Sequence, residues 1–199
     1  MSKSKNFKDA LHFFTAFVTK PHHIGSMVPS SRFLARAMVQ DLSLGQQDGV
    51  LELGPGTGPL TKSIAQILPN PAAFLAIERE KSFVDILTKQ YPNLKFIRGE
   101  AQNMQQICAK ELPYPVKVVL SALPFTLFDE KLQEEILQGL LAVTTTGAIF
   151  RTFQYAHSYS LPQGQRLRQR VSQLFKCEPT KKLVFRNAPP AYVVSWTRN

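Results

Sequence analysis

The chain of 199 residues is long enough for one domain and too short for two ordinary domains joined by a linker. Hydrophobic residues make up 44% of it and include 14 Phe, so a core can form without disulfides or structural metals. The 24 Lys and Arg outnumber the 14 Asp and Glu, which gives a formal net charge of +10. This excess favours an anionic partner: nucleic acid, an anionic membrane surface or a phosphorylated substrate.

The sequence predicts a reduced, cytoplasmic protein without a metal site. Cys108 and Cys177 lie far apart and have no Cys or His at metal-ligand spacing beside them. His22 and His23 have no evident third ligand. No run of about 18 uninterrupted apolar residues is present to span a membrane, and charged residues interrupt any apolar stretch of an N-terminal secretory signal.

Residues 1–40 are predicted to form a helical lid or membrane-contact segment. Residues 6–19 place aromatic and aliphatic side chains at helical spacing among lysines, as in a basic amphipathic helix. A Gly, Ser and Pro-rich passage follows, and a second helix is predicted over residues 32–40, capped by Ser30 or Ser31. The apolar face of the first helix fits a lipid headgroup region or the protein core, and both alternatives stay open.

Residues 41–199 are predicted to form the core of a single α/β domain that spans residues 1–199. Short apolar runs alternate with helical patterns, which is typical of βαβ units and a mostly parallel sheet. A basic helix and two β-rich runs follow, and the runs predict a closing antiparallel hairpin in a sheet of seven strands. The predicted strands are 50–53, 74–77, 95–97, 116–120, 148–153, 182–185 and 192–196, and the predicted helices are 60–68, 81–90, 101–109, 130–141 and 163–175.

A glycine-rich turn follows the first predicted strand, with Gly54, Gly56 and Gly58 in the spacing G-x-G-x-G. Such a turn lies at the carboxyl edge of an open α/β sheet, where ligands bind. It is neither the dinucleotide fingerprint nor a phosphate-binding P-loop, because the spacing differs and no Lys-Ser or Lys-Thr pair follows. Glu52, just before the turn, would repel a phosphate and suits a cationic ligand.

Acidic residues also follow the next two predicted strands. Glu78 closes the second strand, 20 residues beyond Gly58, where a carboxylate can accept both hydroxyls of a ribose. Glu100 and Ala101 follow the third strand, where a side-chain acceptor can meet an adenine amino group. The three strand ends together predict a pocket for a nucleoside.

The pattern E-L-G-x-G-x-G with an acid ending the second strand resembles the class I S-adenosylmethionine-dependent methyltransferases. The resemblance implies their Rossmann-like fold and S-adenosylmethionine as the cofactor. It assigns Glu78 to the ribose and Glu100 with Ala101 to the adenine, although the family more often has Asp at the position of Glu100. The methionine end is assigned to Glu52, Gly54, Gly56 and Gly58.

The segment after the fourth strand, Ser121-Ala122-Leu123-Pro124-Phe125, bears on the methyl acceptor. Adenine N6-methyltransferases of the ribosomal RNA type carry Asn-Leu-Pro-aromatic or a similar motif here. This chain keeps the Leu-Pro-Phe part but has Ser-Ala before it, and Ser has a shorter reach than Asn and no amide. The departure argues against adenine chemistry.

A second resemblance covers nearly the full chain. The bacterial phospholipid N-methyltransferases, which convert phosphatidylethanolamine stepwise to phosphatidylcholine, are similar at separated places in one order: residues 25–31, 51–58, 121–124, 153–155 and 187–191. This resemblance implies a protein peripherally associated with the inner face of the membrane, with an anionic membrane surface and a phospholipid as partners. It also implies contacts of Met27, Ser30 and Ser31 with the cofactor or the lipid headgroup.

Methyl transfer to an amine needs a free lone pair aligned with the methyl group. Backbone carbonyls at Ser121 and Ala122 can hold the amine, and a water or a nearby base then removes its proton. Tyr155 and His157 are candidates for headgroup orientation or proton passage, and Phe125 for covering the amine or closing the cofactor pocket. Each of these three residues is equally compatible with a purely structural role.

Two other functions stay open at this point. One is an RNA adenine N6-methyltransferase, and the other is a membrane- or nucleic-acid-binding protein that keeps the fold without turnover. A basic cluster on the last predicted helix could hold lipid phosphate or RNA phosphate equally well. It comprises Arg166, Arg168, Arg170 and Lys176, with Lys181 and Lys182 after it. No protein partner is evident.

Overall fold

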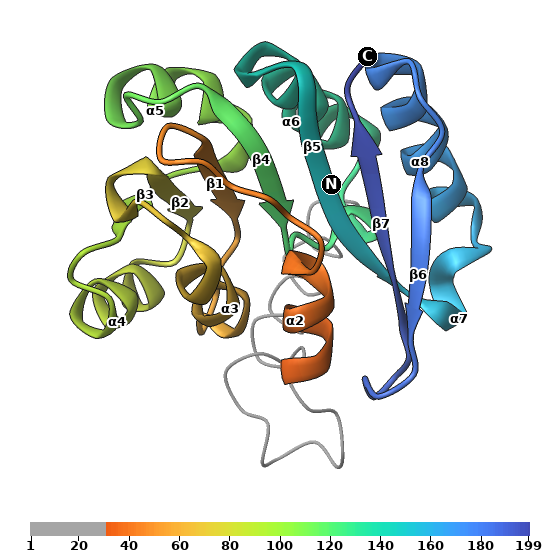
Figure 1. Cartoon of the computed structure of the whole chain (residues 1–199). Helices are drawn as coiled ribbons and strands as arrows, with labels where there is room; N and C mark the ends of the chain where they lie inside the picture. Colours follow the sequence, from red (N-terminus) through yellow and green to blue (C-terminus); the bar gives the residue numbers. More distant parts are fainter. Residues whose placement is uncertain (1–30) are drawn as a thin grey trace, which may run out of the picture.

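The computed structural model describes residues 31–199. Within them, a seven-stranded sheet has the strand order β3-β2-β1-β4-β5-β7-β6 (Figure 1). Neighbouring strands from β3 to β5 run parallel, whereas β7 is antiparallel to both β5 and β6. The predicted fold class is therefore confirmed. The strands are β1 (Gly49–Leu53), β2 (Phe74–Glu78), β3 (Lys95–Arg98), β4 (Val116–Ser121), β5 (Thr144–Tyr155), β6 (Thr180–Val184) and β7 (Ala191–Thr197).

Helices cover both faces of the sheet. One apolar core packs α5, α6 and α8 on one face, and the other packs α2, α3 and α4 on the opposite face. The α-helices are α2 (Arg32–Val39), α3 (Pro59–Ile67), α4 (Lys81–Gln90), α5 (Met104–Glu111), α6 (Glu130–Val143), α7 (Ala156–Tyr159) and α8 (Pro162–Phe175). Short 3₁₀ turns are η1 (Pro71–Ala73), η2 (Ala101–Asn103) and η3 (Phe125–Leu127).

The central strand β1 shows how this arrangement follows from the sequence. All five of its residues are buried, as expected for a parallel strand covered on both faces. Leu51 and Leu53 belong to the first core, and Val50 belongs to the second. Glu52 is the one charged residue among them, so its position needs a reason other than packing.

The structure corrects several predicted element bounds. The predicted helix 101–109 divides into η2 and α5, because helical periodicity does not distinguish a 3₁₀ turn from the first turn of an α-helix. Strand β5 is twice as long as predicted: it begins at Thr144, which pairs with Val116 of β4, and it ends at Tyr155, which pairs with Ala191 of β7. The single-turn helix α7 was not predicted. Strand β6 ends at Val184, which leaves Phe185 outside the strand.

Some predictions fall outside the described residues: the helix over residues 6–19, the pair His22–His23, and the contacts of Met27 and Ser30. In residues 31–199, the two cysteines are free thiols and no group of three or more metal-ligating side chains converges. No helix in this part of the chain has the length and apolar character needed to cross a bilayer.

Candidate functional site

The glycine turn lies at the carboxyl edge of the sheet, between β1 and α3. Gly54 and Gly58 have φ angles of +70° and +86°, a region that side-chain-bearing residues rarely adopt. A Cβ at Gly54 would lie 2.8 Å from Leu123 Cδ2, and a Cβ at Gly58 would lie 2.5 Å from Leu87 Cδ2. The positive φ angles therefore favour glycine at both positions whether or not a ligand is bound, and a side chain there would also displace these leucine methyl groups.

Glu78 links this turn to the end of β2. Its Oε2 accepts a hydrogen bond of 3.0 Å from the Gly56 amide, and its Oε1 accepts one of 3.0 Å from the Glu80 amide. Each carboxylate oxygen has two lone pairs, so both oxygens keep capacity for a further donor such as a hydroxyl. The structure thus brings together the predicted glycine turn and the predicted ribose-binding acid.

Glu52 is completely buried beneath the same turn, with 0% of its surface exposed. The Thr61 hydroxyl on α3 donates to its Oε2 at 2.8 Å, whereas its Oε1 has no hydrogen-bond partner within the described part of the chain. Burial, together with a smaller contribution from the nearby charge of Glu78, raises the pKa of Glu52 to about 8, although the hydrogen bond from Thr61 acts in the opposite direction. A buried carboxyl oxygen without a partner indicates that a donor is missing.

The end of β3 lies next to the end of β2 at the same edge of the sheet. The Gly99 amide donates to the Glu78 carbonyl at 2.9 Å, which places the start of η2 next to the end of β2. Glu100 is exposed and Ala101 is half-buried at the beginning of η2. Glu52, Glu78 and Glu100 therefore stand at the ends of three adjacent strands, as the sequence predicted.

The Ser121 segment lies on the other side of β1. The Ala122 amide donates to the Leu53 carbonyl at 3.0 Å, which holds the segment beside the glycine turn. The Ser121 hydroxyl accepts from the Leu123 amide at 3.2 Å, and the Ser121 carbonyl accepts from the Thr152 hydroxyl at 3.0 Å. Ser121 is buried and shapes the turn, and Ala122 is the first residue of the segment to reach the adjoining pocket.

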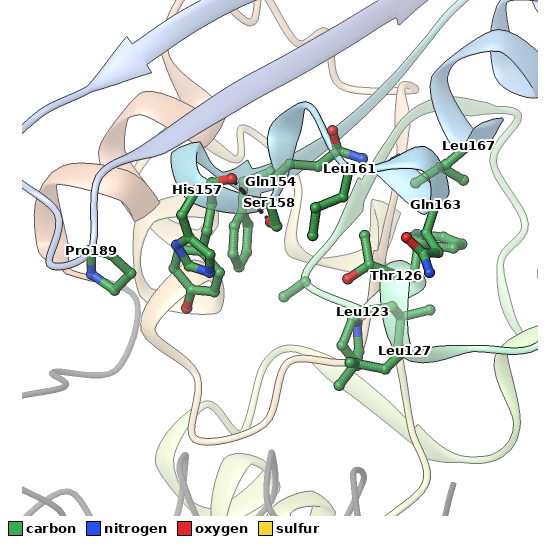
Figure 2. A pocket seen from close by; sticks show the side chains of 15 residues that line it. Leu123, Thr126, Leu127, Gln154, His157, Ser158, Leu161, Gln163, Leu167 and Pro189 are labelled. Atoms are coloured by element: carbon green, nitrogen blue, oxygen red, sulfur yellow. Dashed lines mark hydrogen bonds between the residues drawn. The ribbon is translucent and has the colours of Figure 1, made fainter. Parts of the chain in front are cut away.

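A pocket of about 430 Å³ adjoins this segment (Figure 2). Its lining contains no Asp, Glu, Lys or Arg, and most of it is apolar. In Figure 2, Leu161 extends from the connection between α7 and α8 toward Leu123 and Leu127 on the facing wall. The lining residues are Ala122, Leu123, Pro124, Phe125, Thr126, Leu127, Phe153, Gln154, Tyr155, His157, Ser158, Leu161, Gln163, Leu167 and Pro189.

Three rings form one wall of this pocket. The rings of Phe153 and Tyr155 meet edge to face with centroids 5.7 Å apart, and Tyr155 stacks on His157 with centroids 5.8 Å apart. Burial raises the pKa of Tyr155, so its phenol stays neutral at physiological pH. Tyr155 and His157 thus join the Ser121 segment at one pocket. Phe153 belongs to the same wall and was not predicted as a site residue, although its period-2 spacing from Tyr155 on one strand could have indicated it.

Phe125 packs mainly in the core. It is 3% exposed, and its ring meets Phe150 at 6.3 Å and Phe128 at 5.9 Å in edge-to-face geometry. It contributes part of its surface to the pocket lining. The structure therefore shows that Phe125 is mainly a core residue and that it also contacts the pocket.

Ser31 caps α2, as predicted, because its hydroxyl accepts from the Leu34 amide at 3.3 Å. Its amide donates to Asn187 Oδ1 at 2.9 Å, and its hydroxyl donates to the Arg186 carbonyl at 3.3 Å. The described contacts of Ser31 are therefore with its own helix and with the loop between β6 and β7.

The basic cluster on α8 is largely committed to contacts within the protein. Arg170 forms two hydrogen bonds with Glu134, at 2.6 and 2.9 Å, which lower the pKa of that carboxyl to about 2. Arg168 donates to Gln154 Oε1 at 2.6 Å and lies 3.7 Å from the centroid of the Tyr159 ring. The predicted phosphate-binding role of this cluster is weakened, because its central arginines already have partners.

The strand order, the glycine turn and the acid at the end of β2 define a Rossmann-like methyltransferase of class I. Residues 23–184 match the family described as ribosomal RNA adenine dimethylase. The chain belongs to this family of S-adenosylmethionine-dependent methyltransferases, which confirms the predicted enzyme class and its cofactor.

Solved structures agree with the fold. An O-methyltransferase from Bacillus cereus, solved in complex with SAH, has a TM-score of 0.63 at 14% identity and covers 97% of this chain and 90% of that one. The O-methyltransferase TomG from Streptomyces achromogenes, solved with SAM, has a TM-score of 0.65 at 13% identity over 100% of both chains.

Curated relatives fall into two groups. The ornithine lipid N-methyltransferase of Singulisphaera acidiphila is 27% identical over 187 residues, which cover 92% of this chain and 93% of that protein. The ribosomal RNA small subunit methyltransferase A of Chlorobium luteolum is 31% identical over 77 residues, which cover 39% of this chain and 27% of that protein. The rRNA adenine N-6-methyltransferase of Bacillus licheniformis is 33% identical over 110 residues, covering 54% of this chain and 35% of that protein.

Proposed function

We propose that this protein transfers methyl groups from S-adenosylmethionine to the amine of a membrane lipid, with phosphatidylethanolamine and its methylated intermediates as substrates and phosphatidylcholine as product. The observation that carries the proposal is the mostly apolar pocket beside Ala122 and Leu123, whose lining contains no Asp, Glu, Lys or Arg. Such a lining suits the apolar part of a lipid, and it lacks the Lys and Arg side chains that bind the phosphate backbone of RNA. Similarity to an ornithine lipid N-methyltransferase over nearly the whole chain supports the same substrate class.

The residues at the carboxyl edge fit S-adenosylmethionine. The unpartnered Glu52 oxygen suits the positively charged methionine end, and the free lone pairs of Glu78 suit the ribose hydroxyls. The glycine turn admits the ligand close to the backbone, and Glu100 with Ala101 would meet the adenine. When bound, this cofactor supplies a methyl group on a sulfonium.

The amine would be held at the end of β4. Ala122 lines the pocket, whereas the Ser121 carbonyl already accepts the Thr152 hydroxyl, so the Ala122 carbonyl is the better candidate to accept from the amine. A pocket without charged side chains lowers the pKa of an ammonium group, which favours the neutral amine that can attack the methyl group. Tyr155, whose own pKa is raised, would act as a hydrogen-bonding group, and His157 is the candidate for passing the proton outward.

The aromatic wall gives a reason for repeated methylation. Each transfer makes the amine more substituted, and the final product is a quaternary ammonium. Phe153 and Tyr155 both line the pocket, and aromatic faces attract such cations. Partly methylated lipid would therefore be retained for the next transfer.

One observation favours the alternative of an RNA adenine N6-methyltransferase. Leu123, Pro124 and Phe125 keep the later part of the RNA-type motif, in a family described by that activity. Against it, position 121 holds a buried Ser whose hydroxyl accepts a backbone amide. The lipid substrate therefore remains our first choice.

The test offers methyl-labelled S-adenosylmethionine separately with phosphatidylethanolamine vesicles and with ribosomal RNA. Label is expected in the lipid. Ser158→Trp fills the pocket and should abolish lipid labelling while cofactor binding, measured by calorimetry, persists. Ser160→Trp is the matched control, because Ser160 is exposed and does not line the pocket. Label in RNA alone would reject the proposal, and binding of cofactor without label in either acceptor would favour a protein without turnover.

A further inference from the structure

Phe185 is an exposed aromatic residue that the catalytic site does not use. It follows directly after β6, at the tip of the β6–β7 hairpin, and 74% of its surface is exposed. Among the other large apolar side chains of residues 31–199, the most exposed are Ile86, Leu161 and Leu127, at 52%, 48% and 42%. An exposed Phe on a projecting loop offers apolar area that the fold itself does not bury.

Arg186, next to Phe185 in the sequence, and Arg32 at the start of α2 both contact the Phe33 ring. The Arg186 guanidinium lies 4.1 Å from the centroid of the Phe33 ring, and that of Arg32 lies 5.0 Å from the same ring. Ser31 fastens the start of α2 to the hairpin loop through Arg186 and Asn187. Arg32, Phe33, Phe185 and Arg186 are here called the docking surface.

The charge of this region has a single sign. Residues 31–40 contain Arg32 and Arg36 and no acid, and residues 180–191 contain Lys181, Lys182 and Arg186 and no acid. Within residues 31–199, Arg32 and Arg186 have aromatic contacts and no ion pair with a carboxylate, whereas Arg170 on α8 is paired with Glu134. A cationic surface with an apolar tip is complementary to an anionic lipid headgroup layer.

The docking surface and the pocket share one edge of the molecule. The hairpin loop reaches the pocket through Pro189, and the Ala156 amide donates to the Pro190 carbonyl at 2.8 Å. Leu127 and Leu161 both line the pocket and are exposed. Figure 1 shows the hairpin projecting beside α2 and α7 at this edge.

We infer that the docking surface binds an anionic bilayer, with Phe185 entering the headgroup region and Arg32 and Arg186 meeting lipid phosphates. The pocket then faces the layer from which a lipid must come. This inference rests on the proposed function, because an enzyme whose substrate is a membrane lipid must bind the bilayer to reach it. It is independent of the predicted helix over residues 6–19, which lies outside the described residues.

The experiment measures binding of the full-length, cofactor-free protein to vesicles of phosphatidylglycerol and phosphatidylethanolamine by flotation. Phe185→Ser is expected to weaken the partition constant about tenfold, as the loss of one mostly exposed Phe from an apolar contact predicts. Ile86→Ser on α4 is the matched control and should stay within twofold of wild type. Thermal unfolding of each variant checks that the fold persists.

A positive signal comes from Phe185→Trp. Its added fluorescence should shift to the blue on vesicle addition and be quenched by brominated lipid, against the constant background of the buried Trp196. Equal vesicle binding by wild type and Phe185→Ser, with no shift or quenching in Phe185→Trp, would overturn the inference. Weakened RNA binding with unchanged vesicle binding in Phe185→Ser would overturn it in favour of a nucleic-acid surface.

Methyl transfer to detergent-dispersed lipid separates the two proposals. With detergent-dispersed lipid, Phe185→Ser should transfer methyl groups at the wild-type rate, because the enzyme does not have to bind a bilayer to reach this substrate. If wild type methylates no lipid in detergent while vesicle binding still depends on Phe185, the proposed function fails and the docking surface stands. If lipid is methylated but vesicle binding ignores Phe185, the docking surface fails alone.

Discussion

The substitution Glu52→Gln tests the role of the buried carboxyl group at the end of β1. Glu52 is fully buried, and one of its oxygens has no partner among the described residues. Its pKa in the folded protein is raised to about 8 by burial, from 4.5 for the free group. The replacement amide keeps the shape, and its oxygen can still accept the Thr61 hydroxyl. The variant therefore removes the charge with little change in packing.

The sign of the effect follows from proton linkage. Between pH 4.5 and about 8, the unfolded chain has lost the Glu52 proton and the cofactor-free folded protein keeps it. The contribution of Glu52 to stability is therefore fully present below pH 4.5 and is lost as the pH rises through 8. The free energy of unfolding should fall by about 1.4 kcal/mol per pH unit in this window. For Glu52→Gln this slope should disappear, and the cofactor-free variant should be the more stable protein at pH 8.

Cofactor binding should respond in the opposite direction. A cationic ligand at Glu52 favours the ionised carboxylate, so wild-type affinity should rise by roughly tenfold per unit from pH 6 toward 8, with release of a proton. Glu52→Gln should bind S-adenosylmethionine more weakly and without this pH dependence. Calorimetry in buffers of different ionisation enthalpy measures the released proton, and urea unfolding at several pH values measures stability.

Two results would refute this reasoning. One is a wild-type unfolding free energy, without cofactor, that does not fall between pH 5 and pH 8 relative to Glu52→Gln. The other is an unchanged affinity of Glu52→Gln for S-adenosylmethionine at pH 8. The first result would mean that burial does not raise the pKa of Glu52 in the cofactor-free protein, and the second that Glu52 is an internal polar group of the fold and not the partner of the cationic end of the cofactor.

Two further substitutions test the turn and the aromatic wall. Gly58→Ala should destabilise the protein by about 1–3 kcal/mol in urea unfolding, because φ is +86° and the new Cβ would lie 2.5 Å from Leu87 Cδ2; an unchanged midpoint would contradict the required turn geometry. Phe153→Leu keeps an apolar wall but removes the ring, so mass spectrometry of the lipid product should show later methylations slowed more than the first, by about fivefold or more. Equal slowing of every step would argue against retention of the methylated ammonium by this ring.

Much of the site could be predicted because its residues follow strands directly. An apolar strand, a glycine turn and a helix make a local pattern, and parallel strands bring their carboxyl ends to one edge. Glu52, Glu78 and Glu100 lie at the strand ends predicted on this basis, and the Ser121 segment meets the glycine turn through the Ala122 amide. The helix over residues 6–19 remains a prediction.

The pocket and the docking surface could not be predicted in the same way. The pocket arises where η3, the end of β5, α7, α8 and the hairpin loop meet, and these segments are distant in the sequence. The sequence indicated a basic cluster on α8, but Arg170 is paired with Glu134, 36 residues earlier in the chain. Phe185 was assigned to a strand, and the end of pairing at Val184 leaves it exposed at the hairpin tip.

The sequence by itself determined the sheet, the turn after β1 and the acids that follow the strands, because these depend on the local spacing of apolar, glycine and acidic residues; the resemblance to a known family added the cofactor. Only the tertiary structure decided which oxygen of Glu52 lacks a partner, which arginines are already paired and where an uncharged pocket opens. Each of these depends on side chains that packing brings together from distant segments, and local spacing carries no information about such neighbours.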